Sequence, residues 1–190
     1  MSPTGHLRAD AERNVRAIID AAIILLATEP DASMERVASA AGVGRATVYR
    51  HFASREQLVR AIIDRALQDA RDAVLGSRPE EGDAIEALTR AIESVMRVAD
   101  RYRLVMAISP HDTDLRRRVE EIAVPLRQLV ERGQREGSIR ADVPARWPPA
   151  ALGALVQAVT VQMIDGSLPE SQAAPLVVTT LVDGLRPRPS

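Results

Sequence analysis

Apolar residues recur every three or four positions along most of the chain, which is the period of an amphipathic helix. The first stripe of this kind contains Ile18, Ile19, Ala22, Ile23 and Leu26. No segment alternates apolar and polar residues as a half-buried strand does, so we expect an all-α protein with about nine helices. Their approximate ranges are 11–27, 35–41, 45–51, 54–75, 80–99, 101–108, 113–136, 150–164 and 169–185.

The stretch from Ser33 to Arg55, SMERVASAAGVGRATVYRHFASR, predicts two short helices joined by a tight turn. Gly42 stands at the corner, where a positive φ is expected. Ala38 is small where the helices must approach each other, and Val48 returns to their shared core. This spacing is typical of a helix-turn-helix, whose second helix enters the major groove of DNA.

Capping residues and prolines set the expected helix boundaries. Ser33 is a good N-cap for the first of the two short helices. Ser54 and Gln57 have the spacing of a capping box at the start of the next helix. Pro125 lies inside a later helix, which it should kink or split because proline removes a backbone hydrogen bond.

The break Gly76-Ser77-Arg78-Pro79 predicts a domain boundary. We expect residues 1–57 to form a helix-turn-helix domain and residues 76–190 to form a second helical domain. The helix over residues 54–75 should link the two.

Composition narrows the class of protein. The chain has 190 residues, 46% of them apolar and 27% charged, as in ordinary globular proteins. It contains no Cys, which excludes disulfides and Cys-ligated zinc. We find no apolar run approaching the ~18–20 residues of a membrane span and no apolar segment near the N-terminus. A cytoplasmic protein without membrane contact is therefore expected.

The net charge of −1 does not indicate nucleic-acid binding, but its distribution does. Positions 36, 45, 50 and 55 are all Arg, and no Asp or Glu lies between the first and the last of them. This is a basic patch, which suffices for a protein that contacts a few phosphates in each half-site.

Residues 40–59, AAGVGRATVYRHFASREQLV, and the preceding AIIDAAIILL helix resemble the TetR family of bacterial transcriptional regulators. The run Tyr49, His51, Phe52 before a Ser-capped helix is the most specific part. The resemblance implies an N-terminal three-helix DNA-binding domain, a linking helix, and a C-terminal helical domain that binds a small ligand and dimerises. Gly44 departs from the Ser or Thr that the family often has there, so one hydroxyl contact to phosphate is missing.

The recognition helix and its flanks supply the predicted DNA contacts. Arg45 can donate two hydrogen bonds to guanine O6 and N7, and no acidic neighbour is expected to pair with it. Tyr49 and His51 resemble the family's phosphate clamps, although His51 could instead be structural. Arg55 could hold a phosphate at a helix N-terminus. The predicted DNA-binding residues are Gly44, Arg45, Ala46, Thr47, Tyr49, Arg50, His51 and Arg55, while Val48 and Phe52 should pack in the core.

No catalytic motif is present: the chain lacks a Cys nucleophile, G-x-S-x-G, H-E-x-x-H and a phosphate-binding glycine loop. The cluster His111-Asp112-Thr113-Asp114 is more typical of a helix N-cap than of a metal site. We expect no enzyme activity, no cofactor and no metal.

The prediction of a ligand pocket depends mainly on the resemblance. Methionines adapt to varied ligands, and the few aromatic and amide side chains could orient one. The candidate ligand-binding residues are Met96, Tyr102, Met106, Trp147, Gln157 and Met163, and core packing remains an alternative for each. Because only four aromatic residues occur, an aliphatic effector is favoured over a flat cationic one.

The last two helices are apolar over much of their circumference, which requires burial on more than one side. A four-helix seam between two copies of the chain would bury them and give the recognition helices a two-fold relation. The predicted dimer residues are Gly153, Ala154, Gln157, Ala158, Val161, Val178, Leu181 and Val182.

With these patterns, the resemblance implies a homodimeric repressor that binds a near-palindromic DNA operator and releases it when a small, apolar effector binds. An activator of the same fold is an alternative. A helical interaction or scaffold protein without DNA binding, and an enzyme of unrecognised type, are rivals from other classes. A steep salt dependence of binding to duplex DNA would distinguish the regulator from both rivals.

Overall fold

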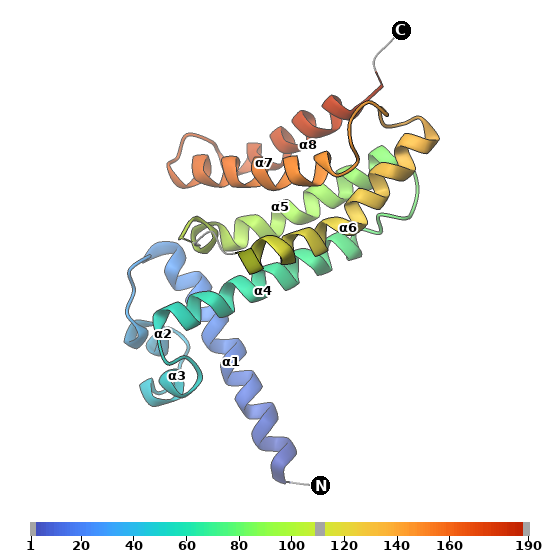
Figure 1. Ribbon diagram of the computed structural model, residues 1–190. Coiled ribbons are helices and arrows are strands. Elements are labelled where there is room, and N and C mark those ends of the chain that lie inside the picture. Colours follow the sequence, from blue (N-terminus) through green and yellow to red (C-terminus); the bar gives the residue numbers. More distant parts are fainter. Residues whose placement is uncertain (1–2, 109–112, 188–190) are drawn as a thin grey trace. The chain divides into compact units, whose positions relative to one another are not determined.

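The computed structural model describes residues 3–108 and 113–187, and the side chains of residues 11–102 and 117–187. All regular secondary structure in these ranges is helical (Figure 1). The helices are α1 (Pro3–Thr28), α2 (Met34–Ala40), α3 (Arg45–His51), α4 (Arg55–Gly76), α5 (Ala84–Ile108), α6 (Thr113–Glu136), α7 (Trp147–Ile164) and α8 (Glu170–Leu185).

The chain divides into two compact units. The first contains residues 1–65 and 104–108, and the second contains residues 66–103 and 109–190. Helices α4 and α5 therefore each continue from one unit into the other.

The first unit is a small bundle in which α2 packs against both α1 and α3 (Figure 1). Its core consists of apolar side chains from all four of its N-terminal helices, and burial of each large one contributes roughly 1.5–3 kcal/mol. The core members are Ile18, Ala22, Ile23, Leu26, Val37, Ala38, Val48, Phe52, Leu58 and Ile62.

The turn between α2 and α3 has the predicted geometry. Gly42 has a φ of 66°, a region that glycine enters without steric cost. Ser33 caps α2, because its hydroxyl accepts a hydrogen bond of 3.3 Å from the backbone N–H of Arg36. Val48 is fully buried. The predictions for these three residues are confirmed.

The capping box at α4 is also confirmed, with one difference. The Ser54 hydroxyl accepts from the Gln57 backbone N–H at 3.4 Å. The Gln57 side chain reaches back to the backbone N–H of Ala53, at 3.0 Å, rather than to that of the capping residue. Two free N–H groups at this end are thus satisfied.

The second unit has a larger core, formed between the end of α4 and helices α5 to α8. Helix α7 runs along α8 and also contacts α6 (Figure 1). The fully buried members of this core include Val74, Ala84, Leu88, Ile92, Val130, Ile139 and Val177.

The prediction of about nine helices is wrong for the part of the chain that the structure describes, which contains eight. Residues 80–99 and 101–108 belong largely to the single helix α5, since no Gly or Pro interrupts it. Helix α5 also begins later than expected, at Ala84. The Asp83 carboxylate caps it by accepting from the backbone N–H groups of Ile85 and Glu86, at 2.8 and 3.1 Å.

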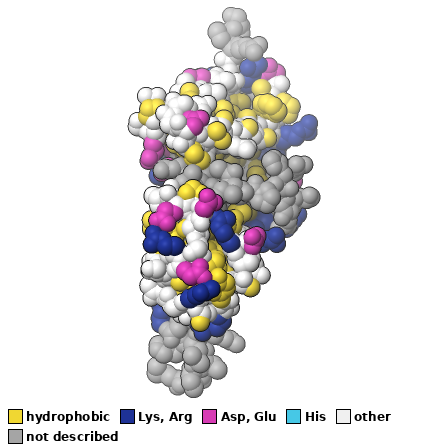
Figure 2. Space-filling view, turned by 90° about the vertical axis from the view of Figure 1, so that its left-hand side faces the viewer, with side chains coloured by type: hydrophobic (Ala, Val, Ile, Leu, Met, Phe, Trp, Pro, Cys, Tyr) yellow, Lys and Arg dark blue, Asp and Glu magenta, His cyan; other side chains and the backbone are white. Residues whose placement is uncertain are grey.

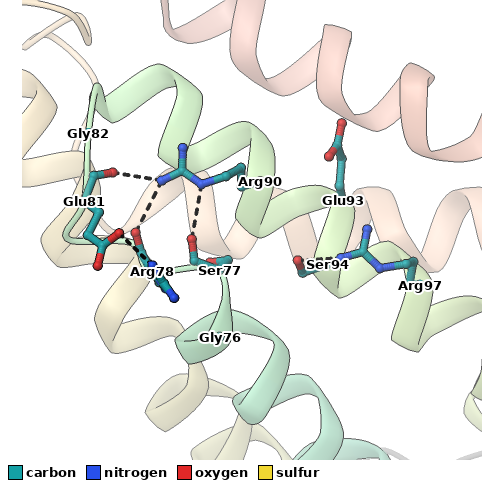
Figure 3. Close-up of a pocket in the computed structure, with 9 residues that line it drawn as sticks. All are labelled: Gly76, Ser77, Arg78, Glu81, Gly82, Arg90, Glu93, Ser94 and Arg97. Carbon is teal, nitrogen blue, oxygen red and sulfur yellow. Dashed lines mark hydrogen bonds and ion pairs between the residues drawn. The ribbon is translucent and has the colours of Figure 1, made fainter.

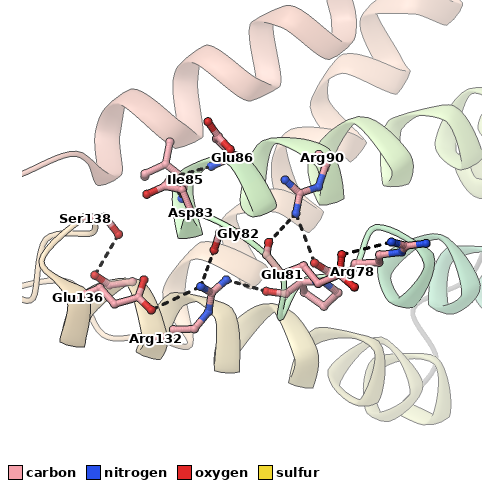
Figure 4. Close-up of polar contacts among 12 residues, drawn as sticks. Arg78, Glu81, Gly82, Asp83, Ile85, Glu86, Arg90, Arg132, Glu136 and Ser138 are labelled. Atoms are coloured by element: carbon pink, nitrogen blue, oxygen red, sulfur yellow. Dashed lines mark hydrogen bonds and ion pairs between the residues drawn. The ribbon is translucent and has the colours of Figure 1, made fainter.

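Pro125 does not split its helix, because α6 is continuous from Thr113 to Glu136. Two arginines hold the connection before α5 in place (Figure 4). Arg132 of α6 donates to the carbonyls of Gly82 and Pro79, at 2.7 and 3.0 Å. Arg90 of α5 donates to the carbonyl of Glu81 at 2.8 Å. Side chains of two helices thus provide hydrogen bonds to the backbone carbonyls of this loop.

Candidate DNA interface and effector cavity

Helix α3 presents one face to solvent and buries the other. Arg45, Ala46, Tyr49 and Arg50 are exposed, while Val48 is buried. The exposed positions share one side of the helix because residues three and four apart lie on the same face of an α-helix. Four of the predicted DNA-binding residues therefore form one continuous accessible surface.

Arg45 is paired with an acidic side chain, contrary to the expectation that it has no such neighbour. Its Nη2 lies 2.8 Å from Oε1 of Glu35, in the first turn of α2. Its guanidinium also lies over the ring of Tyr49, with the carbon 5.4 Å from the ring centroid. The turn brings Glu35 close to Arg45 although ten residues separate them in sequence.

The surroundings of Glu35 favour its ionised form. Its own backbone N–H, the Ser33 hydroxyl, the positive charge of Arg45 and the Tyr49 hydroxyl all lower the pKa of its carboxyl. The carboxylate is therefore ionised throughout the neutral pH range. Its position in the first turn of α2 agrees with the preference of helix N-termini for negative charge.

The remaining arginines of the basic patch have different surroundings. Arg36 pairs with Glu29, with 2.6 Å between Nη2 and Oε1. Arg55 is half-buried and donates to the backbone carbonyl of Pro30. Arg50 is exposed. Figure 2 shows basic and acidic side chains next to each other over the lower half of the view. The patch is thus less positive than its sequence suggests.

The other three predicted DNA contacts, Gly44, Thr47 and His51, differ in how accessible they are. Gly44 is the exposed N-cap of α3, and as a glycine it offers no side chain to cap the helix. Thr47 is half-buried. His51 is also half-buried, and within the described side chains its Nε2 atom is covered and has no hydrogen-bond partner. Any contact of His51 with phosphate would therefore use the other ring nitrogen.

A cavity of about 380 Å³ lies in the second unit, between α5, α7 and the start of α8. Met96 and Met163, two of the predicted ligand-binding residues, both line it. Sequence reasoning missed its charged lining, because these residues have the pattern of solvated positions on amphipathic helices. The other lining residues are Glu93, Arg97, Asp100, Glu170, Ala173 and Ala174.

The other predicted ligand residues do not line this cavity. Tyr102 is buried, and its hydroxyl donates to Oδ2 of Asp69 in α4 at 2.6 Å. Trp147 and Gln157 are exposed on α7. The side chain of Met106 lies outside the described residues.

A second cavity, of about 540 Å³, lies beside the connection between α4 and α5 (Figure 3). Arg90 lines it, but its donors face the carbonyls of Ser77, Arg78 and Glu81. Arg97 donates to the Ser94 hydroxyl at 2.9 Å. Its arginines therefore serve the local structure. Among the described residues no group of three acidic or His side chains could hold a metal, and the His111–Asp114 cluster lies outside the described side chains.

Most of the predicted dimer residues lie on an open surface. Five exposed residues form one stripe along α7, namely Gly153, Ala154, Gln157, Ala158 and Val161. Val178 of α8 is half-buried. Leu181 and Val182 are buried in the core of their own unit, which leaves them little surface for a second copy to cover. The broad apolar stripe of α8 hid which side faces inward, and Leu176 is its large exposed apolar residue.

Helix α7 also corrects the expectation about apolar runs. Its 18 residues, Trp147–Ile164, have the length and composition of a membrane-spanning helix. Only 22% of this stretch is buried within the chain. The sequence pattern hid this because small residues, Gln and Thr interrupt the strongly apolar ones.

Known proteins resemble this chain in sequence and in fold. The family described as "Bacterial regulatory proteins, tetR family" matches residues 18–62. The HTH-type transcriptional repressor LfrR of Mycolicibacterium smegmatis is 32% identical over 178 residues, covering 92% of this chain and 91% of LfrR.

Solved structures agree with these sequence matches. The crystal structure of LfrR from Mycobacterium smegmatis in complex with proflavine has a TM-score of 0.72 at 29% identity, covering 93% of this chain and 99% of the other. FadR from Bacillus subtilis in complex with stearoyl-CoA shares the fold, with a TM-score of 0.69 at 21% identity, covering 90% and 99%. With the helix-turn-helix geometry and a relative that matches nearly its whole length, the chain belongs to the TetR family of bacterial transcriptional regulators, which are DNA-binding proteins and not enzymes.

Proposed function

We propose that this regulator is a homodimeric, ligand-responsive repressor that acts in the cytoplasm and releases a near-palindromic operator when a small molecule binds. The observation that carries the proposal is the exposed face of α3 in a chain related over nearly its full length to the repressor LfrR. Residues 1–57 serve as the DNA-binding domain, and residues 76–190 as the ligand-binding and dimerisation domain.

On DNA, the contacts divide into base readout and phosphate binding. Arg45 reads guanine in the major groove, and Ala46 lets the helix approach closely. Tyr49, Arg50 and Arg55 bind phosphates. Gly44, Thr47 and His51 complete the interface with backbone, hydroxyl and imidazole groups.

The second copy of the chain covers the stripe on α7. A helix that is apolar on all sides and mostly uncovered needs a further partner. Gly153, Ala154 and Ala158 on the stripe are small, which permits close approach of two helices. In a TetR-family chain a dimer seam accounts for this exposure better than a membrane does. Two-fold symmetry then places two recognition helices on successive half-sites about 34–36 Å apart.

The cavity between α5, α7 and α8 is the site that we assign to the effector. Its volume lies in the range of ligand pockets. Three carboxylates, those of Glu93, Asp100 and Glu170, line the cavity with one arginine, Arg97. This excess of negative charge favours a ligand that carries positive charge, beside the thioethers of Met96 and Met163. LfrR was crystallised in complex with proflavine. These features favour an organic cation over the purely apolar effector that the composition suggested.

Release of DNA follows from a shift between two conformations of the dimer. Helices α4 and α5 both run from one unit into the other, so they are the elements that transmit the change. A ligand that binds one arrangement better shifts the population toward it by its differential affinity.

Selection of bound sequences from random duplexes with the full-length protein tests the proposal. We expect a near-palindromic motif, and binding whose logarithm falls steeply with the logarithm of the salt concentration. Arg45→Ala should weaken operator binding by ~1–3 kcal/mol and reduce discrimination at one base pair in each half-site. Tyr49→Phe should instead weaken binding to all sequences alike.

Binding that is independent of salt would favour the scaffold alternative and contradict the proposal. An unchanged ranking of operator variants in Arg45→Ala would remove the base-reading role from that residue. A reporter gene behind the recovered operator separates repressor from activator, because only a repressor lowers its expression.

A further inference from the structure

Glu35 lies beside Arg45 of the predicted DNA-reading surface, although its negative charge is repelled by DNA. Its carboxylate pairs with Arg45, and the Arg45 guanidinium in turn lies over the ring of Tyr49, both residues lying on α3. One acidic side chain is thus linked, through Arg45, to the proposed base reader and a proposed phosphate clamp.

The arrangement restrains the Arg45 side chain at two points. Nη2 is held at 2.8 Å by Glu35, and the guanidinium lies over the Tyr49 ring at 5.4 Å. A single exposed ion pair contributes little to stability, and the two partners here are 67% and 45% exposed. The pair instead affects the conformation of Arg45. A long side chain held by both a carboxylate and a ring loses much of its rotamer freedom before DNA binds.

The pairing leaves Arg45 able to read a base. A guanidinium has five N–H donors, and the Glu35 contact uses the Nη2 end. The remaining donors can face guanine O6 and N7. Phosphates attract Arg45 less, because the neighbouring carboxylate offsets its charge and repels the DNA backbone.

We infer that Glu35 is a positioning residue that makes Arg45 a reader of guanine rather than a general binder of phosphate, so that it sets the sequence specificity of the recognition helix. This inference rests on the proposed function. It adds to it a specificity-determining residue on α2, a helix that holds none of the predicted base contacts.

The chain offers a closely matched control. Glu29 also pairs with an arginine, at 2.6 Å from Arg36, and its side chain is 46% exposed compared with 45% for Glu35. Glu29→Gln and Glu35→Gln therefore change the net charge of the same unit by the same amount. They differ in whether the released arginine belongs to the recognition helix.

The experiment measures fluorescence anisotropy of the selected operator and of a shuffled duplex with wild type and both variants over a series of salt concentrations. We expect Glu35→Gln to lower the ratio of operator affinity to shuffled-duplex affinity about tenfold. On the shuffled duplex its salt slope should steepen by about 0.9, the value for one added phosphate contact. Glu29→Gln should raise both affinities alike and leave the ratio unchanged.

A second comparison assigns the effect to Arg45. In an Arg45→Ala background, Glu35→Gln should change the affinity ratio no more than Glu29→Gln does, because the residue that it positions is absent. Glu35→Ala has neither the carboxylate of the wild type nor the amide of the Gln variant. In the otherwise wild-type chain it should give the same result as Glu35→Gln.

Two outcomes would overturn the inference while leaving the proposed function intact. One is salt-dependent wild-type binding with equal affinity ratios for Glu35→Gln and Glu29→Gln. The other is a loss of specificity in Glu35→Gln that persists in the Arg45→Ala background. Wild-type protein without salt-dependent DNA binding would instead contradict the proposed function, and this inference with it.

Discussion

At the residue scale, arginines of one sequence patch have quite different roles. Arg36 and Arg45 each form an ion pair with a glutamate, and Arg55 donates a hydrogen bond to a backbone carbonyl. Arg50 is exposed. Counting charges along the sequence therefore overstates the attraction of this surface for DNA. Specific recognition then depends on the geometry of a few side chains more than on net charge.

Tyr102 illustrates the same point for the second unit. Its side chain is only 1% exposed, and its hydroxyl donates to Asp69, linking α5 to α4. Tyr102→Phe removes this hydrogen bond to a charged acceptor, so we expect the free energy of unfolding to fall by about 1.5–3 kcal/mol. Urea unfolding followed by circular dichroism measures the change.

The other tyrosine serves as the control for this prediction. Tyr49 is 39% exposed, and Tyr49→Phe should change the free energy of unfolding by less than ~0.5 kcal/mol while weakening DNA binding. Equal stability of Tyr102→Phe and wild type would show that the contact with Asp69 does not hold α4 against α5.

At the element scale, a single close contact fixes how α6 meets the connection that follows it. A Cβ atom on Gly133 would lie 2.6 Å from Cδ1 of Ile139 and 2.9 Å from Cβ of Ala84. Ile139 is buried and Ala84 begins α5, so neither atom can move away freely. Glycine inside a helix is normally a weakness, but here it permits the packing.

Gly133→Ala should therefore lower the free energy of unfolding by about 1–3 kcal/mol, despite the higher helix propensity of alanine. Gly184→Ala in α8 is the matched control, because a Cβ atom added there would meet no other atom within 4 Å. That variant should be neutral or stabilised by up to ~1 kcal/mol. Thermal unfolding of the two variants side by side decides whether the close contact or helix propensity dominates.

The elements also show which features a sequence can predict. The positive φ of Gly42, the Ser33 cap and the Ser54 capping box depend on neighbours within a few positions, and all were predicted. The Glu35–Arg45 pair depends on the path of the chain through the turn, which periodicity does not describe. Likewise, Leu181 and Leu176 lie on one broad apolar stripe, and only packing decides that the first faces inward.

At the scale of the whole molecule, the open stripe on α7 is the surface that we assign to the dimer. Val161 is 51% exposed on this stripe, among small residues. In a two-fold seam, Val161→Glu would bring one buried carboxylate from each copy into an apolar interface, which costs several kcal/mol unless each is paired. We expect this variant to sediment as a monomer and to lose operator binding, because a single recognition helix contacts only one half-site.

Val119→Glu provides the control, because Val119 is 44% exposed on α6 and the substitution is the same. Sedimentation velocity should find it dimeric, with the operator affinity of the wild type. If Val161→Glu also stayed dimeric, the seam would lie on another surface and the exposure of α7 would need a different explanation. If both variants dissociated, the interface would extend to α6. Only dissociation confined to Val161→Glu connects the apolar character of α7 to the pairing of the two DNA-binding domains.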